Sequence, residues 1–354
     1  MMELVITKEQ LWLDKWDAYV LHENRASHLA LSDWNKSFTS YGFEFEICLC
    51  IENDKIIGGF SAVIAKATIF RFYIVPFGPI LSTGLECNLN VLIAQVQENA
   101  KKANCCYAHI SLPFSASVNP HAYPILPELP ALDKATKGHL FKYVYSTYGM
   151  NWIDLNGFDE ESKIMTLKPS VRRNIRNSYR KDLVFKTMTS EEEIEKAYNL
   201  FKENSITAHY SIREWKEMQE TLLKLNEKGS LKMLAAYREN ELKGAILLLK
   251  GGNYYTYILG GSKKEAPDLR TGDFLQWEAI KLSLQEGLDG YNISLGGSKG
   301  VVEFKNSFNT EQIYYDNGQY HWVLKPFYFN LYLFIEKQLK PYKKTISKML
   351  SKFK

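Results

Sequence analysis

A lysine follows a phenylalanine shortly after a glycine-rich turn, and this pair could place a cation next to a reacting group. The turn is GGSKG at residues 296–300, and VVEFKNSF follows it at residues 301–308. Apolar and polar residues alternate in the second segment, so we expect a half-buried strand. Lys305, which follows Phe304, is then either a surface lysine on an edge strand or a cation beside a reacting group.

The glycine-rich turn has two interpretations as well. Successive backbone amides in such a turn can approach a phosphate or a carbonyl oxygen, which makes Ser298 and Lys299 candidate substrate-binding residues. A plain connecting turn fits the sequence equally well.

Arginines recur every fourth residue in the middle of the chain. Pro169 suits the first turn of a helix, and Arg172, Arg176 and Arg180 then share one helical face. With Arg173 they are candidates to bind the phosphates of tRNA or of a nucleotide-linked precursor. The alternative is a solvated helix face. Because no sequence-specific nucleic-acid motif is present, we expect no DNA partner.

Tyrosines mark a predicted strand that ends in two glycines. Tyr255 and Tyr257 are two residues apart, so they face the same side of the strand and either contact an acceptor or fill the core. Tyr210, which lies after a predicted helix, is a further candidate for substrate binding.

The bulk composition is that of a soluble globular protein. The chain has 354 residues, 45% apolar and 24% charged, and is long enough for two domains. The five cysteines have no framework spacing, which indicates reduced thiols. The N-terminus has no signal-peptide pattern, and the seven histidines have no metal-ligand spacing. We therefore expect a cytoplasmic protein without a metal site.

The end of the chain is strongly basic. From His321 onward there are eight lysines and one acidic residue, Glu336, although the net charge of the whole chain is +4. A basic amphipathic segment at residues 327–354 is suited to peripheral contact with the inner face of a membrane. The alternative is a terminal helix that packs on the body and solvates its lysines.

The chain contains one structural unit twice, and the elements of this unit position the residues named above. Each copy has three strands, of which the first two are joined by a polar turn, and then a helix and a fourth strand. The helices are expected at residues 89–103 and 272–286. The strands are expected at residues 43–50, 56–65, 68–80 and 107–111 in the first copy and at 231–237, 242–250, 253–261 and 291–295 in the second.

This pattern predicts a mixed α/β sheet in each half of the chain. We expect a first domain at residues 1–150 and a second at 151–319, joined near residues 148–162. The segment at 320–354 is expected to pack on the first domain.

The second half resembles the Fem-type aminoacyltransferases, which are tandem versions of the Gcn5-related N-acetyltransferase (GNAT) fold. The resemblance rests on GDFLQWEAI at 272–280, YNISLGG at 291–297 and EFKNSF at 303–308. Looser similarity extends over nearly the whole chain. It implies two GNAT-like domains with a cleft between them.

The same resemblance implies roles for individual residues. Lys305 would neutralise negative charge on the donor or on the tetrahedral oxyanion, Phe304 would shape that spot, and Lys36 would bind the acceptor. The sequence also departs from the family, because Ser111-Leu112-Pro113 lacks the acidic residue that some members carry before this proline.

The expected activity is amide formation between an aminoacyl or acyl donor and an amine of a cell-envelope precursor, with a peptidoglycan-type acceptor. Aminoacyl-tRNA or acyl-CoA would be the donor, without a tightly bound cofactor. One alternative is an acyl-CoA-dependent enzyme that acts on an amino sugar or lipid headgroup, although Asp273 would repel phosphate at its helix N-terminus. The other is a non-catalytic protein that binds a precursor or tRNA.

Overall fold

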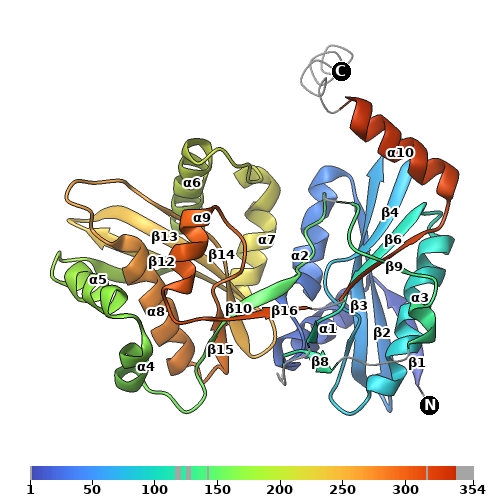
Figure 1. The fold of residues 1–354 in the computed structure, drawn as a ribbon, viewed down its shortest axis with the longest axis horizontal. Coiled ribbons are helices and arrows are strands. Elements are labelled where there is room, and N and C mark those ends of the chain that lie inside the picture. The colour runs from blue at the N-terminus through green and yellow to red at the C-terminus, as the bar shows by residue number, and fades with distance from the viewer. Residues whose placement is uncertain (1, 116–120, 125–128, 142, 316–317, 340–354) are drawn as a thin grey trace.

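The computed structural model describes residues 2–115, 121–124, 129–141, 143–315 and 318–339. It has two mixed α/β halves that lie side by side, and each half is built on one large sheet (Figure 1).

The first sheet combines strands from both ends of the chain. Its strands are β1 (Glu3–Thr7), β2 (Glu44–Glu52), β3 (Lys55–Ala67), β4 (Phe70–Val75), β5 (Ile80–Leu81), β6 (Tyr107–Ser111), β9 (Thr136–Lys137) and β17 (Gln319–Val323). The order is β1-β2-β3-β4-β6-β17-β9, and β5 pairs with β3. Only β4 and β6 run parallel among these described strands. A small separate sheet pairs β7 (Phe114–Ser115) with β8 (Tyr123–Pro124).

The second sheet repeats this arrangement. Its strands are β10 (Gly149–Asp154), β11 (Val184–Met188), β12 (Leu231–Arg238), β13 (Glu241–Lys250), β14 (Tyr254–Ser262), β15 (Gly290–Asn292) and β16 (Glu311–Tyr314). The order is β11-β12-β13-β14-β15-β10-β16, and the parallel pair is β14 with β15.

The two sheets share one connectivity. In each, antiparallel hairpins lead to a strand whose parallel partner is reached through a helix, α3 (Leu89–Lys102) in the first half and α8 (Thr271–Gln285) in the second. In each, the strand beyond the parallel pair comes from outside the repeated unit: β17 beside β6, and β10 beside β15. The duplicated mixed α/β unit predicted from the sequence is therefore confirmed.

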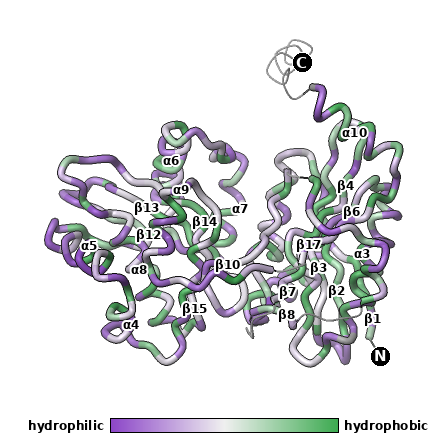
Figure 2. Tube along the Cα trace, in the orientation of Figure 1, coloured by the Kyte–Doolittle hydropathy of each residue, from purple (hydrophilic) through white to green (hydrophobic). Residues whose placement is uncertain are grey.

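Other helices cover the sheets and join the halves. They are α1 (Gln10–His22), α2 (Ser32–Lys36), α4 (Glu160–Thr166), α5 (Pro169–Tyr179), α6 (Glu191–Thr207), α7 (Trp215–Glu227) and the 3-10 helix η2 (Ser37–Tyr41). One hydrophobic cluster contains Trp16 and Ile47 of the first half together with Trp152 and Tyr254 of the second. The strands of both sheets are largely hydrophobic (Figure 2). The two halves therefore share part of their core.

The predicted strand after the glycine-rich turn is wrong. Lys299–Asn306 forms a helix, α9. The alternation that favoured a strand covers few residues, whereas Phe304 and Phe308 are spaced as neighbours on a helix and their rings meet edge to face at 5.4 Å. The consequence is that Lys305 lies on the buried side of a helix.

The chain returns to the first half at its end. After β17 it forms α10 (Pro326–Leu339), where Phe329 stacks on Tyr107 at 4.8 Å and Tyr332 meets Phe72 edge to face at 4.7 Å. The part of the basic segment that follows residue 339 lies outside the described residues.

Candidate functional site

Lys305 is a buried cation on the inner side of α9. The carbonyl oxygen of Ser298 accepts the Val302 N–H at the start of this helix, and two turns on Lys305 is only 4% exposed. Its Nζ donates hydrogen bonds to Ser294 Oγ at 2.8 Å and to the Gly296 carbonyl oxygen at 2.7 Å. Lys305 is therefore not a surface lysine.

Within the described parts of the chain, no carboxylate forms an ion pair with this ammonium group. A third neighbour is the ring of Tyr257, whose centroid lies 5.3 Å from Nζ. Burial lowers the pKa of Lys305 to about 8. Buried charges are normally paired because desolvation is costly, so this arrangement indicates a role other than stability. Two of the three N–H donors bind neutral oxygens, which leaves one for a ligand.

The ammonium group lies where β14 and β15 separate. The last residues that these parallel strands pair are Thr256 and Asn292, after which β14 continues along β13 as far as Ser262. The chain after β15 turns away, with Ser294 in a left-handed conformation at φ 62°. From Tyr257 onward, one edge of β14 has no strand partner among the residues that the structure describes. Such an edge can bind an extended ligand through main-chain hydrogen bonds.

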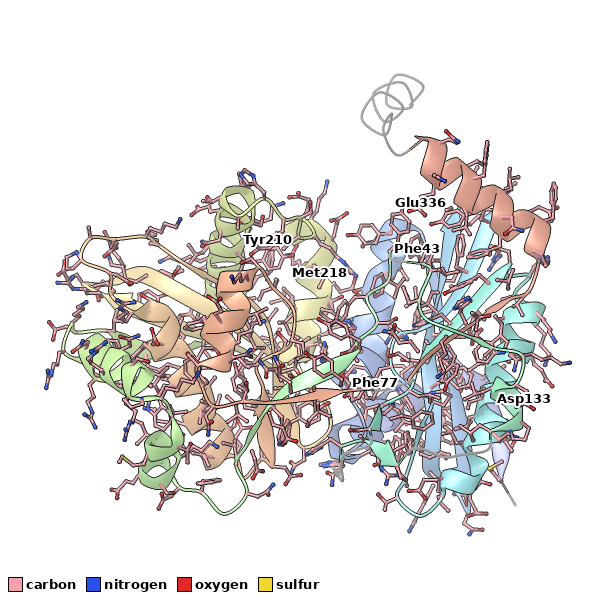
Figure 3. All side chains as sticks on the ribbon, in the orientation of Figure 1. Phe43, Phe77, Asp133, Tyr210, Met218 and Glu336 are labelled. Carbon is pink, nitrogen blue, oxygen red and sulfur yellow. The ribbon has the colours of Figure 1, made fainter. Side chains whose placement is uncertain are left out.

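Two tyrosines line this opening. The hydroxyl of Tyr257 lies over Gly260, where an added Cβ would be only 2.4 Å from it. Burial raises the pKa of Tyr257, and nearby Tyr210 adds to the rise. Tyr210 comes from the loop between α6 and α7 and is 42% exposed (Figure 3). The structure thus brings together Lys305 and Tyr257, with Tyr210 exposed on the loop between α6 and α7.

Asparagine side chains hold the backbone that receives the ammonium group. Asn292 Oδ1 accepts the Ser294 N–H at 2.9 Å and the Asn151 N–H at 3.0 Å. The Asn151 side chain in turn donates to Asn306 Oδ1 of α9 at 2.9 Å. These bonds tie α9, β10 and the end of β15 together, so they fix the Ser294 hydroxyl that binds Lys305.

Four other predicted residues do not contact the ammonium group. The ring of Phe304 faces the N-terminus of α8, where a Cβ at Gly272 would lie 3.4 Å from it. Ser298 and Lys299 are exposed at the start of α9. Tyr255 is fully buried in the core and shares the sheet face of Tyr257.

The predicted arginines lie on α5, which packs against α8. Arg173 and Arg176 are exposed, whereas Arg172 is half-buried and its Nη1 lies 3.2 Å from the sulfur of Met165. Between them, Asn174 donates to the carboxylate of Asp273 in the first turn of α8, at 3.3 Å. Residues two apart on a helix point to opposite sides, so the face that carries Arg172 and Arg176 points away from this contact and toward solvent.

Asp273 places a carboxylate at that helix N-terminus. It is 6% exposed, and burial raises its pKa. Helix N-termini in general favour bound anions, but an ionised Asp273 would repel a phosphate there.

Lys36 lies at a cavity between the two halves. Its Nζ is 3.9 Å from Glu220 Oε1 of α7. The cavity has a volume of about 200 Å³ and is lined by side chains of α2, η2 and α7, among them Lys216 and Lys224.

A larger hollow has no part in this arrangement. It has a volume of about 540 Å³ and lies between α6 and the β12–β13 turn. Its charged lining includes Glu192, Glu195 and Lys263, and none of the residues that contact Lys305 lines it.

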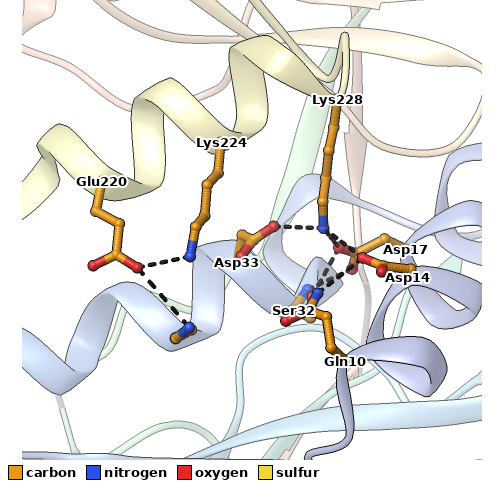
Figure 4. A network of polar contacts seen from close by, with 9 residues as sticks. Gln10, Asp14, Asp17, Ser32, Asp33, Glu220, Lys224 and Lys228 are labelled. Atoms are coloured by element: carbon orange, nitrogen blue, oxygen red, sulfur yellow. Dashed lines mark hydrogen bonds and ion pairs between the residues drawn. The ribbon is translucent and has the colours of Figure 1, made fainter.

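An ion-pair network links the two halves beside the cavity at Lys36 (Figure 4). Lys228, which follows α7, lies 2.7 Å from Asp33, 3.1 Å from Asp14 and 3.1 Å from Asp17. Asp17 also accepts hydrogen bonds from the backbone N–H and hydroxyl of Ser32, both at 2.7 Å. Although burial opposes it, the three carboxylates raise the pKa of Lys228.

Arg213 is a site residue that the sequence did not reveal. It follows α6, yet its Nη1 donates to Ser37 Oγ in the first half at 2.7 Å, and its guanidinium lies 4.2 Å from the ring centroid of Phe38. Burial lowers its pKa, and within the described residues it forms no ion pair. A single arginine in a loop gives no sequence signal for such an interdomain position.

In the described part of the first half, the corresponding place is bridged. There the Gly78 N–H donates to the Ser111 carbonyl oxygen at 2.7 Å, which bridges the chain after β4 to the end of β6. The asymmetry favours the second half as the reactive one.

The cysteines, the possible metal ligands and the helix lengths are further features that bear on function. Cys48, Cys50, Cys105 and Cys106 are buried free thiols. Among the described residues, no group of three or more His, Cys, Asp or Glu side chains is placed to hold a metal ion. In that same part of the chain, every helix is too short or too polar to cross a bilayer.

Comparison with known proteins agrees with this geometry. Residues 168–306, from α5 to α9, match the family described as acetyltransferase (GNAT) domain. No curated protein sequence matches the chain.

Three solved structures illustrate the fold. FemX superposes with a TM-score of 0.76 at 12% sequence identity, over 92% of this chain and 99% of that one. A conserved protein of unknown function from Bacteroides thetaiotaomicron VPI-5482 gives a TM-score of 0.57 at 12% identity, over 90% and 99% of the two chains. L-PGS from Bacillus licheniformis gives 0.51 at 11% identity, over 90% and 97%. The chain therefore has a tandem GNAT-like fold, and its second half carries a segment that matches the GNAT acetyltransferase family.

Proposed function

We propose that this protein forms an amide by transferring an aminoacyl or acyl group to a primary amine of a cell-envelope precursor. The observation that carries the proposal is the ammonium group of Lys305, which is buried at the open edge of β14 and has no carboxylate partner among the residues that the structure describes. The segment that matches the acetyltransferase family includes this residue.

In the proposed reaction, the amine nitrogen attacks the carbonyl carbon of the donor ester or thioester. A C–N bond forms, and the carbonyl oxygen takes up negative charge in a tetrahedral intermediate. The remaining N–H donor of Lys305 stabilises this oxygen, a contribution of about 3 kcal/mol for a preorganised donor in a desolvated site. The intermediate then collapses, the C–O or C–S bond breaks, and the amine proton is transferred to the leaving oxygen or sulfur.

The charges around α8 support aminoacyl-tRNA as the donor. Asp273 makes the N-terminus of α8 unfavourable for a pyrophosphate, whereas Arg173 and Arg176 on the adjacent α5 are exposed and free to contact phosphates along a larger donor. In this proposal the exposed arginines of α5 bind donor phosphates, whereas in the alternative they only contact solvent.

The cations of the interdomain cavity support an acceptor with anionic groups. Lys36, Lys216 and Lys224 line this cavity together with Asp33, Glu217 and Glu220, and Arg213 donates to Ser37, which also lines it. An acceptor held by phosphate or carboxylate groups at the cavity would extend its amine toward Lys305. A peptidoglycan precursor has this combination of anionic groups and a primary amine.

A second candidate function uses acyl-CoA and an amino sugar or lipid headgroup. The observation that favours it is the unpaired edge of β14, which suits a narrow donor arm with amide groups. A third candidate function is binding of a precursor or tRNA without turnover, and the same cavity would serve as its binding site.

The test combines ligand binding with product detection. Thermal unfolding is measured with acetyl-CoA, and retention of charged tRNA on filters is measured beside it, because a ligand that binds the native state raises the melting temperature. We expect tRNA retention without an acetyl-CoA shift, and weaker retention by Arg173→Glu/Arg176→Glu. The control is Lys263→Glu/Lys264→Glu, which makes the same charge change at two exposed lysines elsewhere in this half. An acetyl-CoA shift without tRNA retention would establish the second candidate instead.

A further inference from the structure

Helix α10 has an inner and an outer aromatic face. On the inner face, Phe329 and Tyr332 are 1% and 6% exposed and pack into the first half. On the outer face, Phe327 is 75% exposed and Phe334 is 61% exposed. Phe327 and Phe334 are seven residues apart, which places them on the same side of the helix, whereas Leu331 between them is half-buried and packs against the core of the first half. The two exposed phenylalanine rings thus form an outer apolar stripe, and Phe327 meets the ring of Tyr328 on the same helix at 5.7 Å.

Positive charge surrounds this stripe. Lys325 precedes α10 and lies over the ring of Tyr328, with 5.9 Å between Nζ and the centroid, and Lys337 is exposed in the last turn. The acidic residue of the helix, Glu336, is half-buried beside inward-facing Tyr332 and does not neutralise the outer face (Figure 3). The sequence at 340–354 adds six lysines and no acidic residue.

The position of the helix suits contact with an extended surface. In Figure 1, α10 lies at the outer edge of the first half, and its C-terminal end points away from the body of the protein. An aromatic stripe bordered by lysines matches the boundary of an anionic bilayer, where phenylalanines enter the acyl region and lysines meet the headgroups. A second copy of the chain fits less well, because a twofold contact would bring these basic faces together.

We infer that the outer face of α10 binds anionic lipid and holds the protein at a membrane surface. The contact is peripheral, since α10 has 14 residues and a span needs about 20. The inference goes beyond the proposed function and does not depend on it, because α10 belongs to the first half and Lys305 to the second.

The experiment is co-sedimentation of the full chain with two kinds of vesicle, phosphatidylcholine alone and phosphatidylcholine with phosphatidylglycerol. The test variant is Phe327→Ala/Phe334→Ala. The control is Leu11→Ala/Val184→Ala, which removes side chains that are 66% and 62% exposed elsewhere. We expect binding to the phosphatidylglycerol vesicles that weakens with salt, a loss of at least about tenfold in the test variant, and no loss in the control.

Three results would overturn the inference. The wild-type chain would fail to sediment with phosphatidylglycerol vesicles at low salt, or the test variant would sediment as well as wild type. The third is a wild-type dimer in size-exclusion chromatography that the test variant abolishes, which would assign the stripe to a second copy. The melting temperatures of both variants are measured first and should match wild type, since the replaced side chains face solvent. Acyl transfer to a soluble acceptor is measured separately and should be unchanged in the test variant.

Discussion

The ammonium group of Lys305 and the ring of Tyr257 face each other at the point where β14 and β15 separate, with 5.3 Å between Nζ and the ring centroid. Tyr257 comes from β14, and Lys305 comes from α9 instead of the edge strand that its sequence predicted. The helix α9 and the glycine-rich turn before it place the ammonium group in the interior, where it donates hydrogen bonds to the neutral oxygens of Ser294 and Gly296. The site therefore stores an uncompensated charge that a developing oxyanion can neutralise.

The charge of Lys305 predicts a specific pH dependence of stability. Its pKa is about 8 in the folded protein and about 10.4 in an unfolded chain, so the unfolded state binds more protons between these values. The free energy of unfolding should consequently rise from pH 8 to pH 10 relative to Lys305→Met, by roughly 2–3 kcal/mol. Urea unfolding of both proteins at several pH values measures this. A difference that stays constant over this range would contradict the lowered pKa.

Gly260→Ala tests the placement of Tyr257. The new Cβ would lie 2.4 Å from the Tyr257 hydroxyl, so the ring must move away from the ammonium group. We expect a loss of about 1–2 kcal/mol in stability and at least about tenfold in kcat/KM. Tyr257→Phe removes the closest atom and should restore part of the activity in the Gly260→Ala background, because the Cβ would then lie 3.1 Å from the ring and from Ile246 Cγ2. A double variant no more active than Gly260→Ala would show that the contact with the hydroxyl is not the cause.

Gly300→Ala tests the helix that replaced the predicted strand. Gly300 lies in α9, and a Cβ there meets no atom within 4 Å. Alanine is favoured over glycine within a helix, so the variant should be more stable by about 0.5–1 kcal/mol. Urea unfolding measures the change. Gly297→Ala is the contrasting variant. Gly297 has φ 142°, so the same replacement there should lower the stability of the protein.

Lys228→Met tests the network between the halves. It would leave the carboxylates of Asp17 and Asp33, both nearly buried, without a cation, which should lower the free energy of unfolding by about 2–3 kcal/mol. Lys224→Met is the control, because its partner Glu220 is 74% exposed and the expected loss is under about 0.5 kcal/mol. Equal effects of the two changes in urea unfolding would show that the three aspartates do not depend on Lys228.

The sequence predicted the elements whose signals are local. Polar turns between apolar runs placed the β2–β3 and β12–β13 hairpins, and the apolar spacing at 272–286 placed α8 within one residue. The helix α9 was missed because Val301 and Val302 favour a strand and the signal from Phe304 and Phe308 spans only one turn.

Site residues were predictable only where a motif marked them. The resemblance singled out Lys305, and the structure gives it a buried position with two hydrogen bonds. Arg213 and Lys228 were not foreseen, because their partners Ser37 and Asp33 lie about 180–200 residues away in the chain and meet them only when the two halves pack. Phe304 was expected at the reacting centre, whereas its ring covers the N-terminus of α8.

The most direct test of the account compares wild type and Lys305→Met in amide formation. Charged tRNA and acetyl-CoA are offered as donors with an amine-bearing peptidoglycan precursor, and the amide product is measured by mass spectrometry. The account predicts that the rate falls at least about a hundredfold while the variant remains folded and is more stable at pH 7, by about 1–3 kcal/mol. A folded Lys305→Met protein that forms the product at the wild-type rate would contradict it.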